Sequence, residues 1–346
     1  MPEDKLPIVI IGCGSIIKDA HIPAYEKAGF NILGIYDRNL TKAKKLAFKY
    51  PIVKAYYNTL NDLILEAKVK NAVYDIAVPA NAICDILIEL PEGSVVLIQK
   101  PMGETLEQAE KIAQLCKRKK MVSAVNFQLR YAPEVLAVKD IIQRKLIGDI
   151  YDIEVNVCAN TPWQIWDFLY PLPRVEILYH SIHYLDLIRN ILGDPKSVYA
   201  SSIKHPRMPE LASTRSTIIL YYDDFVQARI ITNHGHDYGL QHQFSYIKFE
   251  GSTGAAKITL GVSLDYPKGK PSKCEYYIRE EGDQWKEEHL KGSWFPDAFI
   301  GSMSELQKHV QDSNHHLSHS TCDALETMRL VENCYKSSQS GGWPNK

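Results

Sequence analysis

The chain has 346 residues, of which 45% are hydrophobic and 23% are charged, and its formal net charge at pH 7 is −1. A globular chain of this length exceeds one ordinary hydrophobic core, so we expect two domains. Because a charge near zero gives no long-range attraction to nucleic acid or to anionic lipid, we expect neither as a partner.

The first predicted elements are a strand, a glycine turn, a helix and a second strand. An apolar run at residues 8–11 leads into Gly12-Cys13-Gly14, a helical pattern follows, and a second apolar run ends on Asp37. In a dinucleotide site Gly12 allows the tight turn, Gly14 lets the backbone approach a pyrophosphate, and the acid meets the adenosine ribose. Ile17 stands at the position of the usual third glycine, and an ordinary strand-to-helix turn is the alternative.

Helices and short strands alternate as far as residue 125. Strands apolar on both faces that alternate with helices are typical of a doubly wound parallel sheet. We therefore expect an α/β fold in which residues 1–125 form an NAD(P)-binding Rossmann domain. The predicted helices are 41–49, 59–66, 81–90 and 106–119, and the predicted strands are 8–11, 32–36, 55–57, 73–77, 95–98 and 122–125.

Strands follow one another directly in the second part of the chain. Consecutive strands with short turns predict an antiparallel or mixed sheet. We expect residues 126–346 to form an α+β domain with a large, mostly antiparallel open sheet, and a cleft between the two domains. The predicted strands are 150–158, 197–202, 213–221, 226–233, 244–250, 255–260 and 274–279, and the predicted helices are 133–144, 176–192, 297–311 and 320–338.

Lys100 is the sharpest candidate for chemistry in the first domain. It follows an apolar strand, at the sheet edge where ligands of open parallel sheets gather, and Pro101 disfavours helix there. In a half-buried cleft beside a cationic nicotinamide its ammonium form would be disfavoured, which suits a proton acceptor. The alternative is a solvated loop lysine. Val78-Pro79-Ala80-Asn81 follows the preceding strand and would lay the backbone along a cofactor.

The helix predicted at residues 176–192 carries the candidates of the second domain. Tyr179 and His183 are four residues apart and share a face, and Asp186 is three residues beyond. A phenol and an imidazole on a helix that lines a cleft can exchange a proton with a hydroxyl group. Each of them taken alone is more commonly a core or surface residue.

The chain resembles the glucose-fructose oxidoreductase / inositol dehydrogenase / rhizopine catabolism (Gfo/Idh/MocA) family over nearly its whole length. The resemblance rests on G-C-G followed by H-I-P-A, V-P-A-N, Q-K-P for the family's E-K-P, N-F-Q-L-R-Y-A-P, H-S-I-H-Y-L-D-L-I-R-N-I-L-G and D-A-L-E-T-M-R-L-V-E-N-C-Y-K-S-S. It implies a dehydrogenase that uses NAD or NADP to transfer a hydride to or from a hydroxyl-bearing carbon of a sugar, sugar derivative or cyclitol.

The resemblance maps the family's lysine onto Lys100 and its helix histidine onto His183. Tyr179 stands where many relatives have an aspartate, and Ser181 where glycine is common, so we expect Tyr179 to assist the two catalytic residues Lys100 and His183. We expect NAD first, because Asp37 would repel the 2′-phosphate of NADP, and NADP second, because Arg38 could bind that phosphate.

The remaining predicted residues surround the cofactor and the substrate. The loop at residues 161–167 mixes aromatic and polar side chains, as a carbohydrate site does, or it is a hydrophobic lid. Two groups of histidines lack zinc spacing, so we predict no metal. The cofactor residues are Gly12, Gly14, Ser15, Ile16, Asp37, Arg38, Pro79, Asn81, Gln99, Lys100 and Gln128; the substrate residues are Lys100, Trp163, Asp167, Tyr179, His183 and His236.

Two other functions and the cellular setting complete the expectations. A glycosidase-like enzyme with tightly bound NAD, and a non-catalytic NAD(P)-binding sensor or assembly protein, are the alternatives. The seven scattered cysteines read as reduced thiols, and the sequence shows no targeting or membrane segment, so we expect a cytoplasmic protein. The resemblance implies a homodimer or homotetramer formed through the C-terminal sheet.

Overall fold

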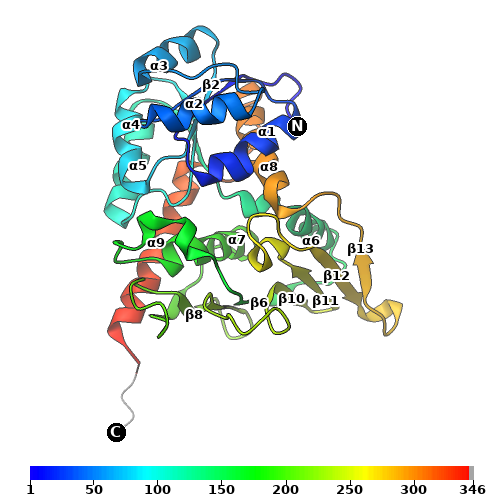
Figure 1. Cartoon of the computed structure of the whole chain (residues 1–346). Coiled ribbons are helices and arrows are strands. Elements are labelled where there is room, and N and C mark those ends of the chain that lie inside the picture. Colours follow the sequence, from blue (N-terminus) through cyan, green and yellow to red (C-terminus); the bar gives the residue numbers. More distant parts are fainter. Residues whose placement is uncertain (343–346) are drawn as a thin grey trace. The chain divides into compact units, whose positions relative to one another are not determined.

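The structure is a computed structural model that describes residues 1–342 (Figure 1). The last four residues of the predicted second domain, 343–346, lie outside the described residues. The chain forms two compact units: unit 1 comprises Met1–Tyr131 with Pro296–Met328, and unit 2 comprises Ala132–Phe295 with the residues from Arg329 onward. The predicted domains, 1–125 and 126–346, stay a prediction; the compact units differ in that unit 1 also takes in a late segment of the chain.

Unit 1 is built on a five-stranded parallel sheet, which confirms the predicted doubly wound fold. Its strand order is β2-β1-β3-β4-β5. All residues of β1 and β3 are buried, as expected for a sheet with helices on both faces. The strands are β1 (Ile8–Ile11), β2 (Ile32–Tyr36), β3 (Val73–Ile76), β4 (Val95–Ile98) and β5 (Val122–Val125).

One predicted strand of unit 1, at residues 55–57, is wrong. Only two isolated bridges, Ile32 to Val53 and Ile35 to Tyr56, form there beside β2. The backbone bonds from Tyr57 N–H to Ile35 O, 2.9 Å, and from Ile35 N–H to Ala55 O, 3.1 Å, follow no continuous ladder. The segment is therefore too short and too irregular to complete a sixth strand.

Three helices of unit 1, α2, α3 and α5, begin at polar caps in the sequence. The side chains of Asn39, Thr59 and Thr105 each accept a backbone N–H of the helix that follows them. The helices of unit 1 are η1 (Ile17–His21), α1 (Ile22–Ala28), α2 (Leu40–Lys49), α3 (Leu60–Val69), η2 (Ala80–Ala82), α4 (Ile83–Glu89), α5 (Leu106–Arg118) and η3 (Gln128–Tyr131). Two further helices, α8 (Trp294–Gln311) and α9 (Thr321–Ser340), divide their residues between units 1 and 2.

Unit 2 is built on an eight-stranded mixed sheet, which confirms the predicted large, mostly antiparallel open sheet. The strand order is β13-β12-β11-β10-β6-β9-β8-β7, and only β6 and β9 pair in parallel. The strands are β6 (Ile150–Cys158), β7 (Ser197–Ile203), β8 (Arg215–Tyr221), β9 (Gln227–Asn233), β10 (Phe244–Gly251), β11 (Gly254–Thr259), β12 (Lys273–Ile278) and β13 (Lys286–Glu288). The sequence did not predict β13, because its three residues are charged and exposed.

The helices of unit 2 cover one face of this sheet. Helix α6 (Pro133–Gln143) packs against β11 and β12, and α6 and α7 (Ile182–Leu192) lie on the same side of the strands (Figure 1). The predicted helix 176–192 begins with a π turn, η6 (Ile177–Ser181). The remaining short helices are η4 (Trp163–Ile165), η5 (Asp167–Leu169), η7 (Gly261–Leu264) and η8 (Arg279–Glu281).

Candidate functional site

The glycine turn after β1 has the geometry that a dinucleotide needs. Gly12 has a φ of 103°, and a Cβ there would lie 2.2 Å from the carbonyl oxygen of Ala77, so no other residue fits. A Cβ on Gly14 would meet nothing within 4 Å. The protein therefore leaves open space beside the backbone of Gly14, where a pyrophosphate would approach.

Asp37 lies at the end of β2 and is bonded to the same turn. Its Oδ2 accepts the backbone N–H of Cys13 at 2.8 Å, and its Oδ1 accepts that of Asn39 at 2.7 Å. These bonds hold the carboxylate beside the glycine turn. The structure thus brings Gly12, Gly14 and Asp37 together, while the neighbouring Arg38 is exposed.

Lys100 lies two residues after the end of β4 and is half-buried. Burial lowers the pKa of its ammonium group to about 8. Its backbone N–H donates to Oε1 of Gln99 at 2.8 Å. A lysine with this pKa has about a tenth of its amine neutral at pH 7, and that form can accept a proton.

The other predicted cofactor residues lie on loops of unit 1. Pro79 precedes η2, which contains Asn81, and Ser15 and Ile16 are half-buried before η1. Gln128, on η3, is 2% exposed, and its Oε1 has no hydrogen-bond partner among residues 1–342. A buried acceptor of this kind is rare and fits a polar ligand group, such as a cofactor amide.

A cluster of buried polar side chains, which the sequence did not predict, adjoins Lys100 through Gln99. His21 Nδ1 is 2.7 Å from Asp75 Oδ2, which also accepts the Tyr25 hydroxyl at 2.8 Å. The amide nitrogens of Gln99 and Asn126 lie 3.1 and 3.4 Å from His21 Nε2. The available signal was Asp75, an acid inside an otherwise apolar strand that needs a buried partner.

The predicted catalytic residues of unit 2 lie on η6 and α7. Tyr179 is half-buried and its ring contacts that of Phe168 at 5.8 Å. His183 is 7% exposed and its ring meets that of Trp294 at 6.0 Å, edge to face. Asp186, one helical turn later, is buried. Their catalytic roles stay predictions.

The predicted substrate residues of the 161–167 loop differ in exposure. Trp163 is 4% exposed and belongs to a core cluster with Leu169, Val175 and Leu211, whereas Asp167 is exposed. The surroundings of Trp163 are therefore those of a hydrophobic cluster, and the substrate role of Trp163 stays a prediction. His236, in the loop after β9, has a buried Nε2 with no hydrogen-bond partner in the described part of the chain.

Glu176, His180 and His234 form a group whose candidate metal-ligand atoms lie within 4.8 Å of one another. The Glu176 carboxylate already accepts hydrogen bonds from Ser181 at 2.7 Å, from His234 at 3.2 Å and from Ser216. Burial alone would raise the pKa of Glu176, but the bonds from His234 and the two hydroxyls hold it below its usual value. The ring centroids of His180 and His234 are 4.0 Å apart.

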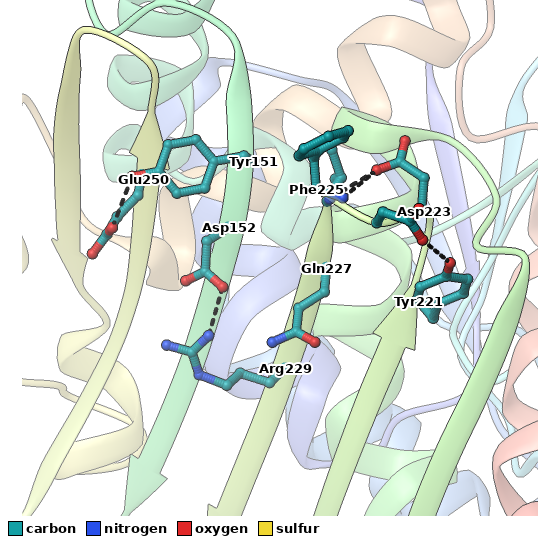
Figure 2. Close-up of a pocket in the computed structure, with 10 residues that line it drawn as sticks. Tyr151, Asp152, Tyr221, Asp223, Phe225, Gln227, Arg229 and Glu250 are labelled. Carbon is teal, nitrogen blue, oxygen red and sulfur yellow. Dashed lines mark hydrogen bonds and ion pairs between the residues drawn. The ribbon is translucent and has the colours of Figure 1, made fainter.

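A hollow on unit 2 lies away from the predicted site residues. It is lined by side chains of β6, β8, β9 and β10 and of the β8–β9 turn, among them Tyr151, Tyr221 and Phe225 (Figure 2). Arg229 donates to Asp152 at 2.6 Å and to Glu154, so these two carboxylates are paired with a cation. None of the predicted catalytic or substrate residues lines this hollow.

Similar proteins agree with this picture. Residues 6–127 match a family described as "Oxidoreductase family, NAD-binding Rossmann fold", and residues 135–257 match the "GFO/IDH/MocA C-terminal domain". A D-glucoside 3-dehydrogenase of Escherichia coli is 25% identical over 59% of this chain and 59% of its own length. The chain spans between 53% and 65% of the lengths of three curated relatives that it matches.

Two solved structures share the fold over almost the whole chain. An oxidoreductase from Agrobacterium radiobacter, solved with NAD⁺, L-tartaric acid and magnesium, has a TM-score of 0.78, 19% identity and 98% coverage of both chains. The WlbA dehydrogenase from Bordetella pertussis, solved with NADH and UDP-GlcNAcA, has a TM-score of 0.74, 19% identity and 100% coverage of both chains. At these identities the likeness establishes the fold alone. With the two family matches, it follows that this chain belongs to the Gfo/Idh/MocA family of NAD-binding oxidoreductases.

Proposed function

We propose that the protein is a dehydrogenase that transfers a hydride between nicotinamide and a hydroxyl-bearing carbon of a sugar, sugar derivative or cyclitol. The observation that carries the proposal is Lys100, which follows β4 at the sheet's carboxyl edge and has a pKa lowered to about 8. NAD supplies the hydride acceptor when bound. The protein supplies the pyrophosphate turn at Gly12 and Gly14 and a lysine that takes the hydroxyl proton.

The role of His183 follows the family resemblance, and the remaining roles follow the residue types found in the sequence. The imidazole of His183 and the phenol of Tyr179 assist Lys100 in accepting the proton from the substrate hydroxyl or donating it back. Trp163, Asp167 and His236 bind the substrate. Support for a carbohydrate comes from the relatives, since one is named D-glucoside 3-dehydrogenase and one neighbour was solved with UDP-GlcNAcA.

NAD is the preferred cofactor in this proposal, with NADP second. Asp37 is held beside the glycine turn by two backbone bonds, so its negative charge would meet a 2′-phosphate there. Arg38 is exposed and free to turn toward such a phosphate. Comparing kcat/KM for the two cofactors decides between them, and a strong NADP preference would contradict the role given to Asp37.

The same proposal includes a homo-oligomer formed through the sheet of unit 2. Support comes from large apolar side chains exposed on neighbouring strands at one edge of this sheet: Tyr199 is 63% exposed, Ile203 47%, Ile219 38% and Ile231 38%. Such a group on a sheet face is a typical protein interface.

Of the described helices, none is long and apolar enough to span a bilayer. We also propose a cytoplasmic location, in keeping with seven free cysteines.

The decisive experiment follows the absorbance of reduced nicotinamide with a panel of aldoses, glycosides and cyclitols. We expect turnover with at least one of them when NAD is added in excess. Stoichiometric NAD in the purified protein together with release of an aglycone would favour the glycosidase-like alternative. Nucleotide binding with no turnover on any compound would favour a sensor or assembly protein.

A further inference from the structure

A line of hydrogen bonds inside unit 1 ends at the backbone of Lys100. Asp75 Oδ2 lies 2.7 Å from His21 Nδ1, and His21 Nε2 lies 3.1 Å from Gln99 Nε2. The other end of the same amide, Oε1, accepts the N–H of Lys100 at 2.8 Å. Asp75 and His21 are fully buried and Gln99 is 8% exposed, so water does not compete for these bonds.

The chemistry of the groups fixes the direction of every bond in this line. A backbone N–H can only donate, so the atom of Gln99 that faces Lys100 is the amide oxygen and the atom that faces His21 is the NH₂ group. Because an NH₂ group donates, His21 Nε2 must accept and carries no proton. The imidazole proton is then on Nδ1 and is donated to Asp75, which leaves His21 uncharged.

A second amide beside His21 agrees with a neutral ring. The second amide, Asn126, also turns its nitrogen toward Nε2, at 3.4 Å. The Tyr25 hydroxyl donates to Asp75 Oδ2 at 2.8 Å, and the Phe299 ring lies 4.8 Å from the imidazole. A carboxylate in place of the Gln99 amide would instead require a proton on Nε2, and His21 would become a cation.

We propose that Asp75, His21 and Gln99 are positioning residues for Lys100, and that the amide at position 99 keeps His21 neutral. The inference rests on the proposed function, in which Lys100 takes the substrate proton. Gln99 can orient the Lys100 backbone only while its NH₂ group is held by His21, which Asp75 holds in turn. Displacing a reacting group by about 1 Å costs on the order of 100-fold in rate, so a fixed backbone matters at this residue.

Three variants separate positioning from a general structural effect. Gln99→Leu removes the oxygen that accepts the Lys100 N–H. Gln99→Glu replaces that amide oxygen with a carboxylate oxygen, which can also accept it. Tyr25→Phe is the matched control, because it removes a buried bond to the same Asp75 oxygen but lies off the line to Lys100. All three are compared by kcat at the plateau of the pH profile, KM, and NADH affinity from fluorescence titration.

We expect Gln99→Leu to lower kcat about 10- to 100-fold, with KM changed less than about twofold. Gln99→Glu should recover kcat to within about threefold of wild type, since the Lys100 N–H regains its acceptor, and Tyr25→Phe should stay within about twofold. Unchanged kcat in Gln99→Leu, or an equal loss in Tyr25→Phe, would overturn the positioning role.

The protonation of His21 has a readout that does not depend on turnover. Long-range ¹H–¹⁵N correlation spectra of the wild-type protein should show a neutral imidazole protonated on Nδ1, assigned by its loss in His21→Gln. In Gln99→Glu the same signal should become that of a doubly protonated ring. A wild-type ring protonated on Nε2, or charged, would overturn the assignment. If no substrate turns over at all, the proposed function fails, and these spectra still decide the state of His21.

Discussion

Each unit of the protein contains a buried pair of a histidine and a carboxylate, and these two pairs are connected differently. In unit 1, His21 bonds to Asp75 and its second nitrogen faces amides, one of which leads to the Lys100 backbone. In unit 2, His234 bonds to Glu176 at 3.2 Å and its second nitrogen meets the Thr161 hydroxyl at 2.8 Å. The first pair leads toward a predicted catalytic residue, and the second joins a loop, a helix and a strand end.

This difference shows that a buried ionisable pair is not by itself a sign of catalysis. Both carboxylates are fully buried. Glu176 accepts bonds from Ser181, Ser216 and His234, which are far apart in the sequence, so its main effect is to hold segments together. Four experiments test the contrast between unit 1, where we propose that the line of hydrogen bonds positions Lys100, and unit 2, where a buried carboxylate joins distant segments.

The largest expected effect is on Lys100. Lys100→Ala should lower turnover by about 10²- to 10⁴-fold, the usual contribution of a general acid or base, while NAD affinity is largely kept. Steady-state kinetics with the best substrate of the panel, together with a nucleotide titration, measure both. Turnover at the wild-type level would remove Lys100 from the mechanism.

The second effect is on the stability of unit 2. Glu176→Leu leaves His234 and two hydroxyls without their acceptor and should cost about 3–5 kcal/mol of unfolding free energy in urea. Since the pKa of Glu176 is lowered in the folded state, its contribution is fully present above its ordinary pKa of about 4.5 and is lost as the pH falls through the lowered value.

The control for this experiment is Glu210→Leu, at an exposed position of the same unit. It should change the unfolding free energy by less than about 0.5 kcal/mol. A difference between Glu176→Leu and wild type that stays constant from neutral pH to well below 4.5 would contradict the role of the charged carboxylate.

A smaller effect is the pH dependence of oxidation. With a lysine pKa of about 8, kcat/KM should rise about tenfold per pH unit below that value and level off above it, because only the neutral amine accepts the proton. The reverse reaction should show the opposite slope. A profile that is flat between about pH 6.5 and 9 would mean that another group takes the proton.

The smallest effect on turnover is expected from a change among the exposed apolar side chains of β7, β8 and β9. Ile219→Asp places a charge among exposed apolar side chains and should shift the oligomer toward monomers in light scattering coupled to size exclusion, with turnover per chain roughly kept. Lys44→Asp, at an exposed position of α2, is the control and should leave the mass unchanged. An unaltered mass for Ile219→Asp would place the interface elsewhere.

The sequence by itself determined both sheets, the glycine turn and the strand end that carries Lys100. Hydrophobic periodicity, cap residues and glycine act over a few residues, so they can be read locally. For the same reason the bounds of β1, β2, β4 and β5 match the predicted ranges. The strand predicted at residues 55–57 was wrong and β13 was not predicted. A short run beside an edge strand gives little local signal, and neither does a short edge strand of charged residues.

Only the tertiary structure decided which polar side chains meet in the interior. His21, Asp75 and Gln99 come from a helix, from β3 and from the residue after β4, which are far apart in the sequence, and no spacing rule connects them. Glu176 and His234 meet for the same reason. A buried hydrogen bond depends on distances of a few tenths of an ångström between distant segments, and those distances are fixed by the packing of the whole unit.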